Sequence, residues 1–297
     1  MVLYNNIKIR FLILLGSILY LTACDHKPSS TINVEEIVPW CIIGFDTEER
    51  TPSERIEMLQ NLGIKKYGYN RGKADFTSMK EEFQLADEKG MEITSIFLWL
   101  NPKRDSLEKL SPANQDLLHN LRDSPHKPAI WVSFSESYFK DLDQQQSINL
   151  SIEYLTYIKK EAEKLGLPMA IYNHNGWFGN PHNQLAILEQ MGQSDITMVY
   201  NFHHAQEYVN DFSDIAKQIT PHLSFVNLNG VKKEGPQIIT LGEGEHELDM
   251  ITKLVDAGYK GEWGILGHIK TEDVEVVLKR NLAGLEKLNL ELGSRSR

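Results

Sequence analysis

Short apolar runs alternate with amphipathic stretches along almost the whole chain after residue 37. The apolar runs have the length and composition of buried strands, and the stretches between them repeat apolar residues at the helical period. In residues 147–165, for example, Ile148, Ile152 and Leu155 lie on one stripe. This stretch ends at Gly166, as the left-handed cap of a helix prefers. The pattern therefore predicts strands and helices in regular alternation.

The apolar runs predict strands over residues 38–45, 66–69, 92–98, 129–134, 169–173, 196–201, 223–228 and 263–267. The amphipathic stretches predict helices over residues 52–62, 76–89, 106–121, 147–165, 181–191, 205–219, 247–257 and 271–290. Eight strand–helix units in about 250 residues match the count and size of a (β/α)8 TIM barrel. A doubly wound open sheet is the alternative, but it offers no reason for eight units. We predict an α/β protein with a single barrel domain over residues 37–292.

The beginning of the chain has the pattern of an export signal. Lys8 and Arg10 precede an apolar run over residues 11–20, and small residues follow it. The ending Leu21-Thr22-Ala23-Cys24 resembles the lipobox of bacterial lipoproteins, in which the cysteine is lipidated and becomes the new N-terminus. An uncleaved transmembrane anchor is the alternative, but the apolar run is short for a membrane span.

We therefore predict a lipoprotein signal peptide over residues 1–23, lipidation of Cys24 and a polar tether over residues 24–36. The barrel would lie outside the cytoplasm, in the periplasm or at the cell surface. The only other cysteine is Cys41, so the folded part has no partner for an internal disulfide. The stability of the domain must come from its hydrophobic core.

The chain is acidic, with 31 Lys and Arg residues against 41 Asp and Glu residues and a net charge of −10. An acidic chain without basic clusters binds phosphate backbones poorly, so we expect no nucleic-acid partner. Anionic lipid would not attract it either. Attachment to a membrane would depend on the lipid carried by Cys24.

Histidines follow three of the predicted strands. His174 comes after the fifth strand, His203 and His204 after the sixth, and His268 after the eighth. In such barrels the active site lies at the C-terminal ends of the strands, so these residues would meet at one mouth. Several histidines at one mouth favour a functional site over separate structural roles. Since adjacent residues of a strand face opposite sides, we expect His204 to face the site and His203 to point away.

Three segments carry a family resemblance: Gly242-Glu243-Gly244 with the helix after it, residues 173–179, and residues 200–204. They resemble the xylose-isomerase-like barrels of the sugar phosphate isomerase/epimerase family, which share their fold with endonuclease IV. The last two segments are similar to an exported bacterial branch of that family. The resemblance covers residues 168–290 well, and the first half of the chain by topology. It implies the barrel fold and an activity on sugars.

The resemblance also implies a metal site, and there the chain departs from the family. The acids that the family has after strands five, six and eight fall on Tyr172, Asn201 and Leu266, and its strand-seven histidine falls on Asn227. A neutral amide does not replace a charged ligand at similar affinity. One divalent ion, Zn²⁺ or Mn²⁺, would have to use a three-histidine site of the kind zinc accepts. The candidate ligands are His174, His204 and His268.

Two functions fit these observations. The first is an exported isomerase or epimerase that removes a proton next to the carbonyl of a carbohydrate. Such an enzyme needs a base and a group that stabilises the enediolate. We predict His174 and His204 as the proton-transfer pair, with Glu136 as a second candidate base and Lys232 as a candidate stabiliser. The predicted sugar-binding residues are Asn173, Trp177, Asn201, Asn227, Asn229 and His268.

The second function is a carbohydrate-binding barrel that has lost catalysis. The replaced acids favour it, because asparagine and tryptophan are common in sugar-binding sites. A carbohydrate lyase or hydrolase of the same fold is a further alternative. The histidines favour an enzyme, since binding alone has little need of several imidazoles at one mouth.

Overall fold

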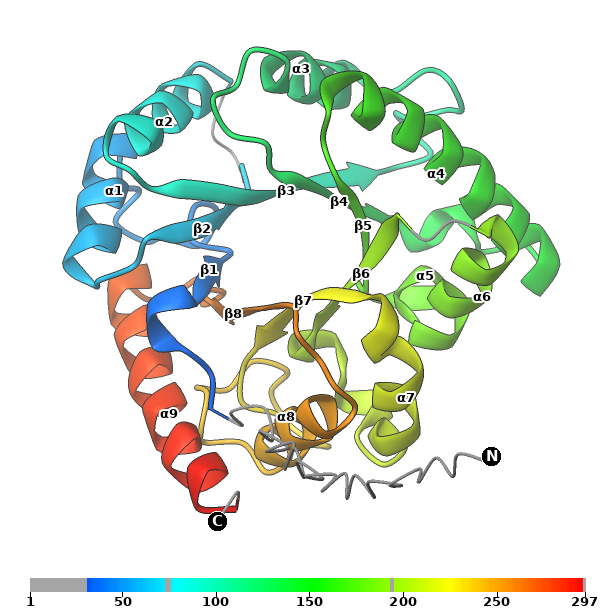
Figure 1. Ribbon diagram of the computed structural model, residues 1–297. Helices are drawn as coiled ribbons and strands as arrows, with labels where there is room; N and C mark the ends of the chain where they lie inside the picture. Colours follow the sequence, from blue (N-terminus) through cyan, green and yellow to red (C-terminus); the bar gives the residue numbers. More distant parts are fainter. Residues whose placement is uncertain (1–30, 73–75, 193–194, 296–297) are drawn as a thin grey trace, which may run out of the picture.

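The computed structural model describes residues 31–72, 76–192 and 195–295 (Figure 1). Eight parallel strands form one sheet in the order β1-β8-β7-β6-β5-β4-β3-β2, and β1 lies beside β2 in the ring. The helices surround this nearly closed barrel. The predicted (β/α)8 fold is confirmed. The predicted signal peptide, Cys24 and the first part of the tether lie outside the described residues.

The strands lie where the apolar runs predict them. They are β1 (Val38–Trp40), β2 (Lys66–Tyr69), β3 (Glu92–Leu100), β4 (Ala129–Phe134), β5 (Met169–Tyr172), β6 (Ile196–Asn201), β7 (Leu223–Leu228) and β8 (Glu262–Leu266). The largest difference is in β1, which ends five residues earlier than expected. Cys41 has a φ of 60°, a left-handed conformation that residues with a Cβ rarely adopt, and it turns the chain out of the sheet.

The helices are α1 (Pro52–Asn61), α2 (Phe76–Glu88), α3 (Pro112–Leu121), α4 (Gln144–Leu165), α5 (Gly176–Gly179), α6 (Pro181–Met191), α7 (Phe212–Ile219), α8 (Glu247–Asp256) and α9 (Val274–Arg295). Short 3₁₀ turns are η1 (Val34–Glu36), η2 (Glu136–Tyr138), η3 (Phe202–His204), η4 (Gln206–Tyr208) and η5 (Thr220–His222). The predicted helices that begin latest are α3, by six residues, and α7, by seven, because turns at the barrel mouth occupy their first residues. Those turns carry much of the site described below.

Aromatic side chains fill the inside of the barrel. The ring centroids of Trp40 and Trp131 are 4.4 Å apart, and Trp131 stacks on Tyr172 at 5.8 Å with an angle of 13° between the rings. Gly68 of β2 makes room for them, since a Cβ there would lie 2.4 Å from the Trp40 ring. The barrel is therefore a packed core, and a ligand has space only at its mouth.

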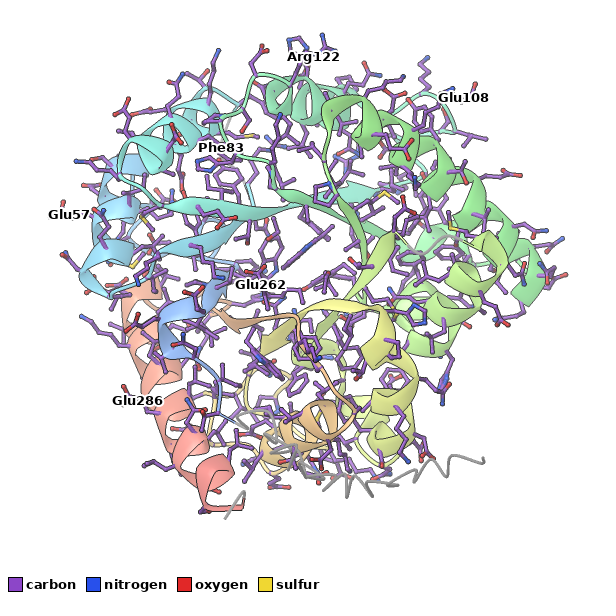
Figure 2. The ribbon with its side chains drawn as sticks, viewed as in Figure 1. Glu57, Phe83, Glu108, Arg122, Glu262 and Glu286 are labelled. Carbon is purple, nitrogen blue, oxygen red and sulfur yellow. The ribbon has the colours of Figure 1, made fainter. Side chains whose placement is uncertain are left out.

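A second apolar layer lies between the strands and the helices. Phe83 of α2 belongs to it, whereas charged side chains such as Glu57, Arg122 and Glu286 lie on the outside of the helix ring (Figure 2). Part of the predicted tether also packs on this body. Ile32 is 4% exposed, and its backbone N–H and C=O both pair with the side chain of Asn289 on α9 at 2.8 Å.

No helix in the described part of the chain combines the length and the apolar character needed to cross a membrane.

Candidate active site

Four histidines meet at the C-terminal mouth of the barrel. The ring centroids are 4.6 Å apart for His174 and His204, 4.3 Å for His204 and His203, and 5.0 Å for His203 and His268. His174 follows β5, the adjacent pair lies in η3 after β6, and His268 follows β8. We call these four residues the histidine cluster.

The prediction that His203 points away from the site is wrong. Alternation holds only while the chain stays extended, and it leaves β6 at Asn201 to form the 3₁₀ turn η3. The Asn201 side chain caps this turn by accepting a hydrogen bond from the backbone N–H of His203 at 3.0 Å. Successive side chains of a 3₁₀ turn are about 120° rather than 180° apart, and the His203 ring lies beside those of His204 and His268 in the histidine cluster.

Burial and mutual repulsion keep the histidine cluster uncharged at neutral pH. Burial is the largest cause, and it lowers the pKa of His174 and of His268 to about 4. The pKa of His204 is lowered to about 2 by burial and by the three other imidazoles around it. Each added proton would repel the next, so the cluster favours neutral rings with free lone pairs.

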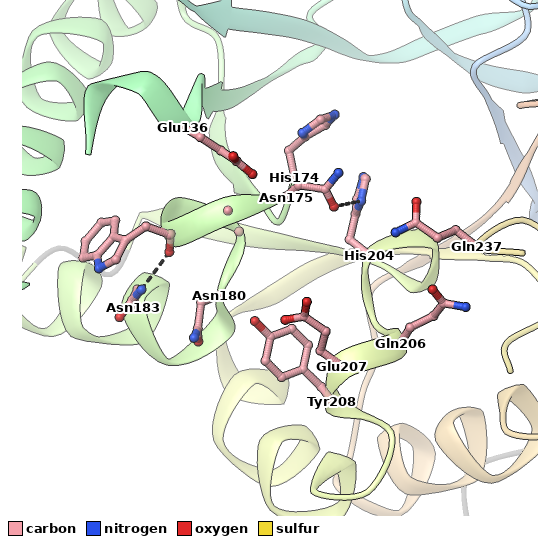
Figure 3. Close-up of a pocket in the computed structure, with 13 residues that line it drawn as sticks. Glu136, His174, Asn175, Asn180, Asn183, His204, Gln206, Glu207, Tyr208 and Gln237 are labelled. Atoms are coloured by element: carbon pink, nitrogen blue, oxygen red, sulfur yellow. Dashed lines mark hydrogen bonds between the residues drawn. The ribbon is translucent and has the colours of Figure 1, made fainter. Parts of the chain in front are cut away.

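Asn175 orients His204. Its Oδ1 lies 2.8 Å from the Nδ1 of His204, as the dashed line in Figure 3 shows. An amide oxygen only accepts, so Nδ1 carries the proton in this arrangement and Nε2 keeps its lone pair. His204 is thereby held as a hydrogen-bond acceptor or proton acceptor at its Nε2 atom.

A polar cavity of about 540 Å³ opens beside His174 and His204 (Figure 3). This is within the usual size range for small-molecule sites, about 300–1,000 Å³. Its other lining side chains are mostly amides, carboxylates and aromatic rings: Glu136, Asn175, Trp177, Asn180, Asn183, Gln206, Glu207, Tyr208 and Gln237. We call it the main cavity.

Besides His174 and His204, two predicted residues have a defined place in the main cavity. Glu136 leans over Gly176, where a Cβ would lie 2.3 Å from the Glu136 Cγ, and the φ of 80° at Gly176 also favours glycine. Trp177 packs on Phe139 with ring centroids 4.8 Å apart, and its Nε1 donates to Gln144 at 2.8 Å. The indole is thus held in position at the wall of the cavity.

Asn173 and Lys232 do not line the main cavity. Asn173 is fully buried and ties β5 to β6, because its amide pairs with the backbone N–H and C=O of Asn201 at 2.6 and 3.3 Å. Lys232 turns toward Glu245, with Nζ 3.9 Å from a carboxylate oxygen. It contributes its backbone C=O, which accepts from Gln206 at 2.9 Å. Both residues shape the site rather than contact a ligand in this cavity.

Three asparagines form a buried amide layer at the ends of β6 and β7. Asn201 donates to the hydroxyl of Tyr172. Asn227 pairs in register with Asn201 and is fully buried, yet neither of its amide atoms has a hydrogen-bond partner within the described protein. The Oδ1 of Asn229 also lacks one. An unsatisfied buried polar group costs about 1–3 kcal/mol, so these atoms suit a buried water.

The loop between β7 and α8 closes one side of the mouth and is anchored by Glu247. This carboxylate is 2% exposed and accepts hydrogen bonds from the backbone N–H groups of Val231 at 3.0 Å, Gly242 at 3.1 Å and Gly244 at 2.7 Å. A Cβ on Gly244 would lie 2.0 Å from the carboxylate. Gly244 therefore lets the backbone approach Glu247, whereas Gly242, with a φ of 83°, packs against Gly284 of α9.

No family model matches the chain, and no curated protein matches it in sequence. Solved structures do match it. An L-ribulose 3-epimerase superposes with a TM-score of 0.66 at 14% identity, over 87% of this chain and 96% of its own. A D-psicose 3-epimerase from Clostridium cellulolyticum H10, solved with D-tagatose, gives 0.63 at 16% identity, over 86% of this chain and 98% of its own.

A xylose isomerase domain containing protein from Salmonella typhimurium LT2 gives a TM-score of 0.62 at 14% identity, covering 89% of this chain and 98% of its own. This chain has the fold of the xylose-isomerase-like barrels. The resemblance drawn from residues 168–290 is thereby confirmed at the level of the fold, and it extends to the first half of the barrel.

Within the described residues, the strand ends do not carry the donor set of a carboxylate metal centre. Leu266 is an apolar buried residue, and burial raises the pKa of the Tyr172 phenol, which stays neutral. The Asn201 amide is engaged by Tyr172 and His203. Within the described ranges no group of three or more His, Cys, Asp or Glu side chains is arranged to hold a metal ion. The residues present do not fit the metal centre that the resemblance implies.

Sequence reasoning missed several residues of this barrel's main cavity. Asn175 lies between two residues of interest, but no pattern marks an asparagine as the partner of a distant histidine. Glu207 and Tyr208 fall in the predicted helix 205–219, but the chain forms η4 there and brings them to the cavity. Gln206 and Gln237 also lie in turns. The one signal in the sequence that could have indicated Gln206 and Gln237 is that both follow the end of a predicted strand.

Proposed function

We propose that this xylose-isomerase-like barrel is a sugar isomerase or epimerase that moves a proton next to a carbonyl at the mouth of the barrel. The observation that carries the proposal is the pair His174 and His204, two imidazoles with centroids 4.6 Å apart that both line the main cavity. Histidine is a common proton-transfer group, and a sugar fits a cavity of this size and polarity.

In this proposal His204 is the first base. Asn175 fixes Nδ1 as the protonated atom, so Nε2 accepts the proton from the sugar carbon. His174 lies beside His204 on the same wall of the cavity and returns a proton to the neighbouring carbon or oxygen. Because the pKa of each imidazole is lowered in part by its neighbours, the pair holds one proton at a time and releases it readily.

Neutral donors serve the enediolate oxygen. The side-chain amides of Asn175 and Gln237, which line the main cavity, are the donors nearest to a bound sugar. Preorganised donors of this kind stabilise developing negative charge without a cation. Glu136, across the main cavity, is the alternative base for a substrate bound further from the barrel axis.

Export of the chain and lipidation of Cys24 are part of the same proposal. A protein outside the cytoplasm meets free or oxidised sugars and glycosides rather than phosphorylated ones. We expect the substrate among these neutral or oxidised carbohydrates.

Carbohydrate binding without catalysis is the second candidate. Imidazoles with a pKa of about 2 to 4 are weak bases, and the amides that line the main cavity suit the hydroxyls of a sugar. Trp177 offers an aromatic wall. In this case a sugar stabilises the protein but is recovered unchanged.

The test is product analysis by NMR after incubation with a panel of free ketoses and keto-glycosides. We expect conversion of at least one sugar, reduced about 100-fold or more in His174→Gln/His204→Gln, as loss of acid–base catalysis requires. His182→Gln is the matched control, an exposed histidine of α6 outside the histidine cluster. Conversion at the wild-type rate by the double variant would contradict the proposed mechanism, and binding without conversion would favour the second candidate.

A further inference from the structure

Two neighbouring loops of the barrel mouth are joined by one arginine. β1 and β8 lie side by side in the sheet (Figure 1), and the chain after them forms the loops 41–51 and 267–273. Arg50 of the first loop reaches Asp273 of the second, with Nη1–Oδ1 and Nη2–Oδ2 distances of 2.7 and 3.1 Å. We propose that Arg50 is a positioning residue of the histidine cluster, because it holds the two loops so that Phe45 packs on His268. The effect on catalysis rests on the proposed function, whereas the effect on His268 does not.

Arg50 has charged partners in both loops and on α9. In its own loop Nη1 also donates to the Asp46 carboxylate at 2.7 Å, and at the start of α9 Nη2 donates to Glu275 at 3.3 Å. Its hydrogen bonds lower the pKa of the Asp273 carboxyl, which stays charged at neutral pH. A guanidinium that pairs with carboxylates through several of its N–H groups is fixed in direction as well as in place. The Arg50 side chain is 13% exposed and that of Asp46 is fully buried, so salt screens their contact little.

The backbone of Arg50 is fixed by a buried contact of its own. Arg55 of α1 donates from Nη2 to the backbone C=O of Arg50 at 2.8 Å and from Nε to Glu82 of α2 at 3.0 Å. Glu82 is 1% exposed and also accepts from the Tyr67 hydroxyl of β2 at 2.9 Å. The first loop is thus anchored to α1, α2 and β2, and the Arg50 side chain extends this anchorage to the second loop.

The two rings that the loops carry lie next to these contacts in the sequence. Phe45 directly precedes Asp46, and His268 lies in the same short loop as Asp273. The ring centroids of Phe45 and His268 are 3.7 Å apart, with an angle of 51° between the rings. The contact between the rings therefore depends on how the two loops are held together.

His268 connects this contact to the proton-transfer pair of the proposed mechanism. Its ring centroid is 5.0 Å from that of His203, which is 4.3 Å from that of His204. Protein interiors are closely packed, so a displaced ring shifts its neighbours. A misplacement of about 1 Å caused far from the chemistry can cost about 100-fold in rate. We therefore expect loss of the Arg50 contacts to slow catalysis through the histidine cluster.

The test is NMR of the histidine ring C–H groups in the full chain in detergent micelles, with ¹³C-labelled histidine. A nearby aromatic ring shifts such signals, so those of His268 report the position of Phe45. His268→Gln assigns the signals, and Phe45→Leu gives their position without the neighbouring ring. The tested variants are Arg50→Gln and Asp273→Asn. The second is the milder change, at a side chain that is 28% exposed, and it decides the question if Arg50→Gln does not fold.

Arg280→Gln is the matched control. It removes the same charge and breaks another ion pair between α9 and the β8–α9 loop, from Arg280 to Glu272 at 2.8 Å, whose side chains are 41% and 36% exposed. Thermal unfolding followed by circular dichroism shows which variants are folded.

We expect Arg50→Gln and Asp273→Asn to move the His268 signals at least half of the way toward their position in Phe45→Leu. Arg280→Gln should leave them in place. On a sugar that the wild type converts, the kcat of Arg50→Gln should fall about tenfold or more, with KM within about twofold.

Two results would overturn the inference: His268 signals that keep their wild-type positions in the folded variants, or moved signals with an unchanged kcat. The first is measured without substrate, so it is distinct from a failure of the proposed function, which is judged by conversion and by the histidine variants. Moved signals in a protein that converts no sugar would support the positioning of His268 and count against catalysis.

Discussion

The anchoring of the β7–α8 loop by Glu247 gives the sharpest stability prediction. The change is Glu247→Gln, which keeps the shape of the side chain but removes its charge and turns one acceptor oxygen into a donor. Either the N–H of Val231, or those of Gly242 and Gly244, would then face the new amide N–H₂ instead of an acceptor.

The cost follows from these contacts. Hydrogen bonds to a charged group are worth about 1.5–3 kcal/mol each, and a buried donor left unsatisfied costs about 1–3 kcal/mol. With at least one of three bonds lost at a site that is 2% exposed, and the others no longer charge-assisted, we expect a loss of about 2–4 kcal/mol. For a domain of this size that lowers the melting temperature by about 5–10 °C.

The assay is thermal unfolding followed by circular dichroism at neutral pH. Glu245→Gln is the control, since its carboxylate is 65% exposed and lies 3.9 Å from Lys232, a pair worth little in water. If Glu247→Gln melts within about 1 °C of the control, the carboxylate does not anchor the loop. Gly244→Ala should be destabilising for the same reason, because its Cβ would collide with Glu247.

Three further predictions concern the mouth and the N-terminus. The pKa values of His174 and His204 are about 4 and about 2, so both bases stay unprotonated well below neutrality. We therefore expect kcat/KM to be flat from about pH 7 to 5 and to fall only near pH 4 and below. A fall centred near the ordinary histidine pKa of about 6.5 would contradict this. Asn175→Ala should lower kcat about tenfold with little change in KM, whereas Asn175→Asp should raise the pKa of His204 and move the acid limb to higher pH; identical pH profiles would exclude the orienting role. Cys24→Ser should move the protein from the membrane to the soluble fraction of the cell envelope, and unchanged fractionation would argue against lipid attachment.

The barrel was predictable because its strands are buried on both faces. Such strands are continuous apolar runs, and seven of the eight lie within two residues of the predicted ends. The exception, β1, stops at Cys41, whose left-handed backbone no hydrophobic pattern indicates. Boundaries set by one backbone angle are not encoded in periodicity.

The candidate site was predictable only in part. Placing residues after strand ends brought His174, His204 and His268 to one mouth, and the structure shows them there. His203 was misplaced because the period of two ends at Asn201, where a side-chain cap starts a 3₁₀ turn. The role of Asn175 depends on its contact with His204 from another loop, which spacing along the chain does not reveal.

The measurement that tests the central claim most directly is deuterium wash-in from D₂O, followed by NMR on the sugar that the protein converts. His204 lines an open cavity, so a proton that it holds can exchange with solvent. The account predicts deuterium at the carbon next to the carbonyl with the wild-type chain, and none above background with His174→Gln/His204→Gln. Conversion without any wash-in, or wash-in that persists in the double variant, would show that the histidines do not move this proton.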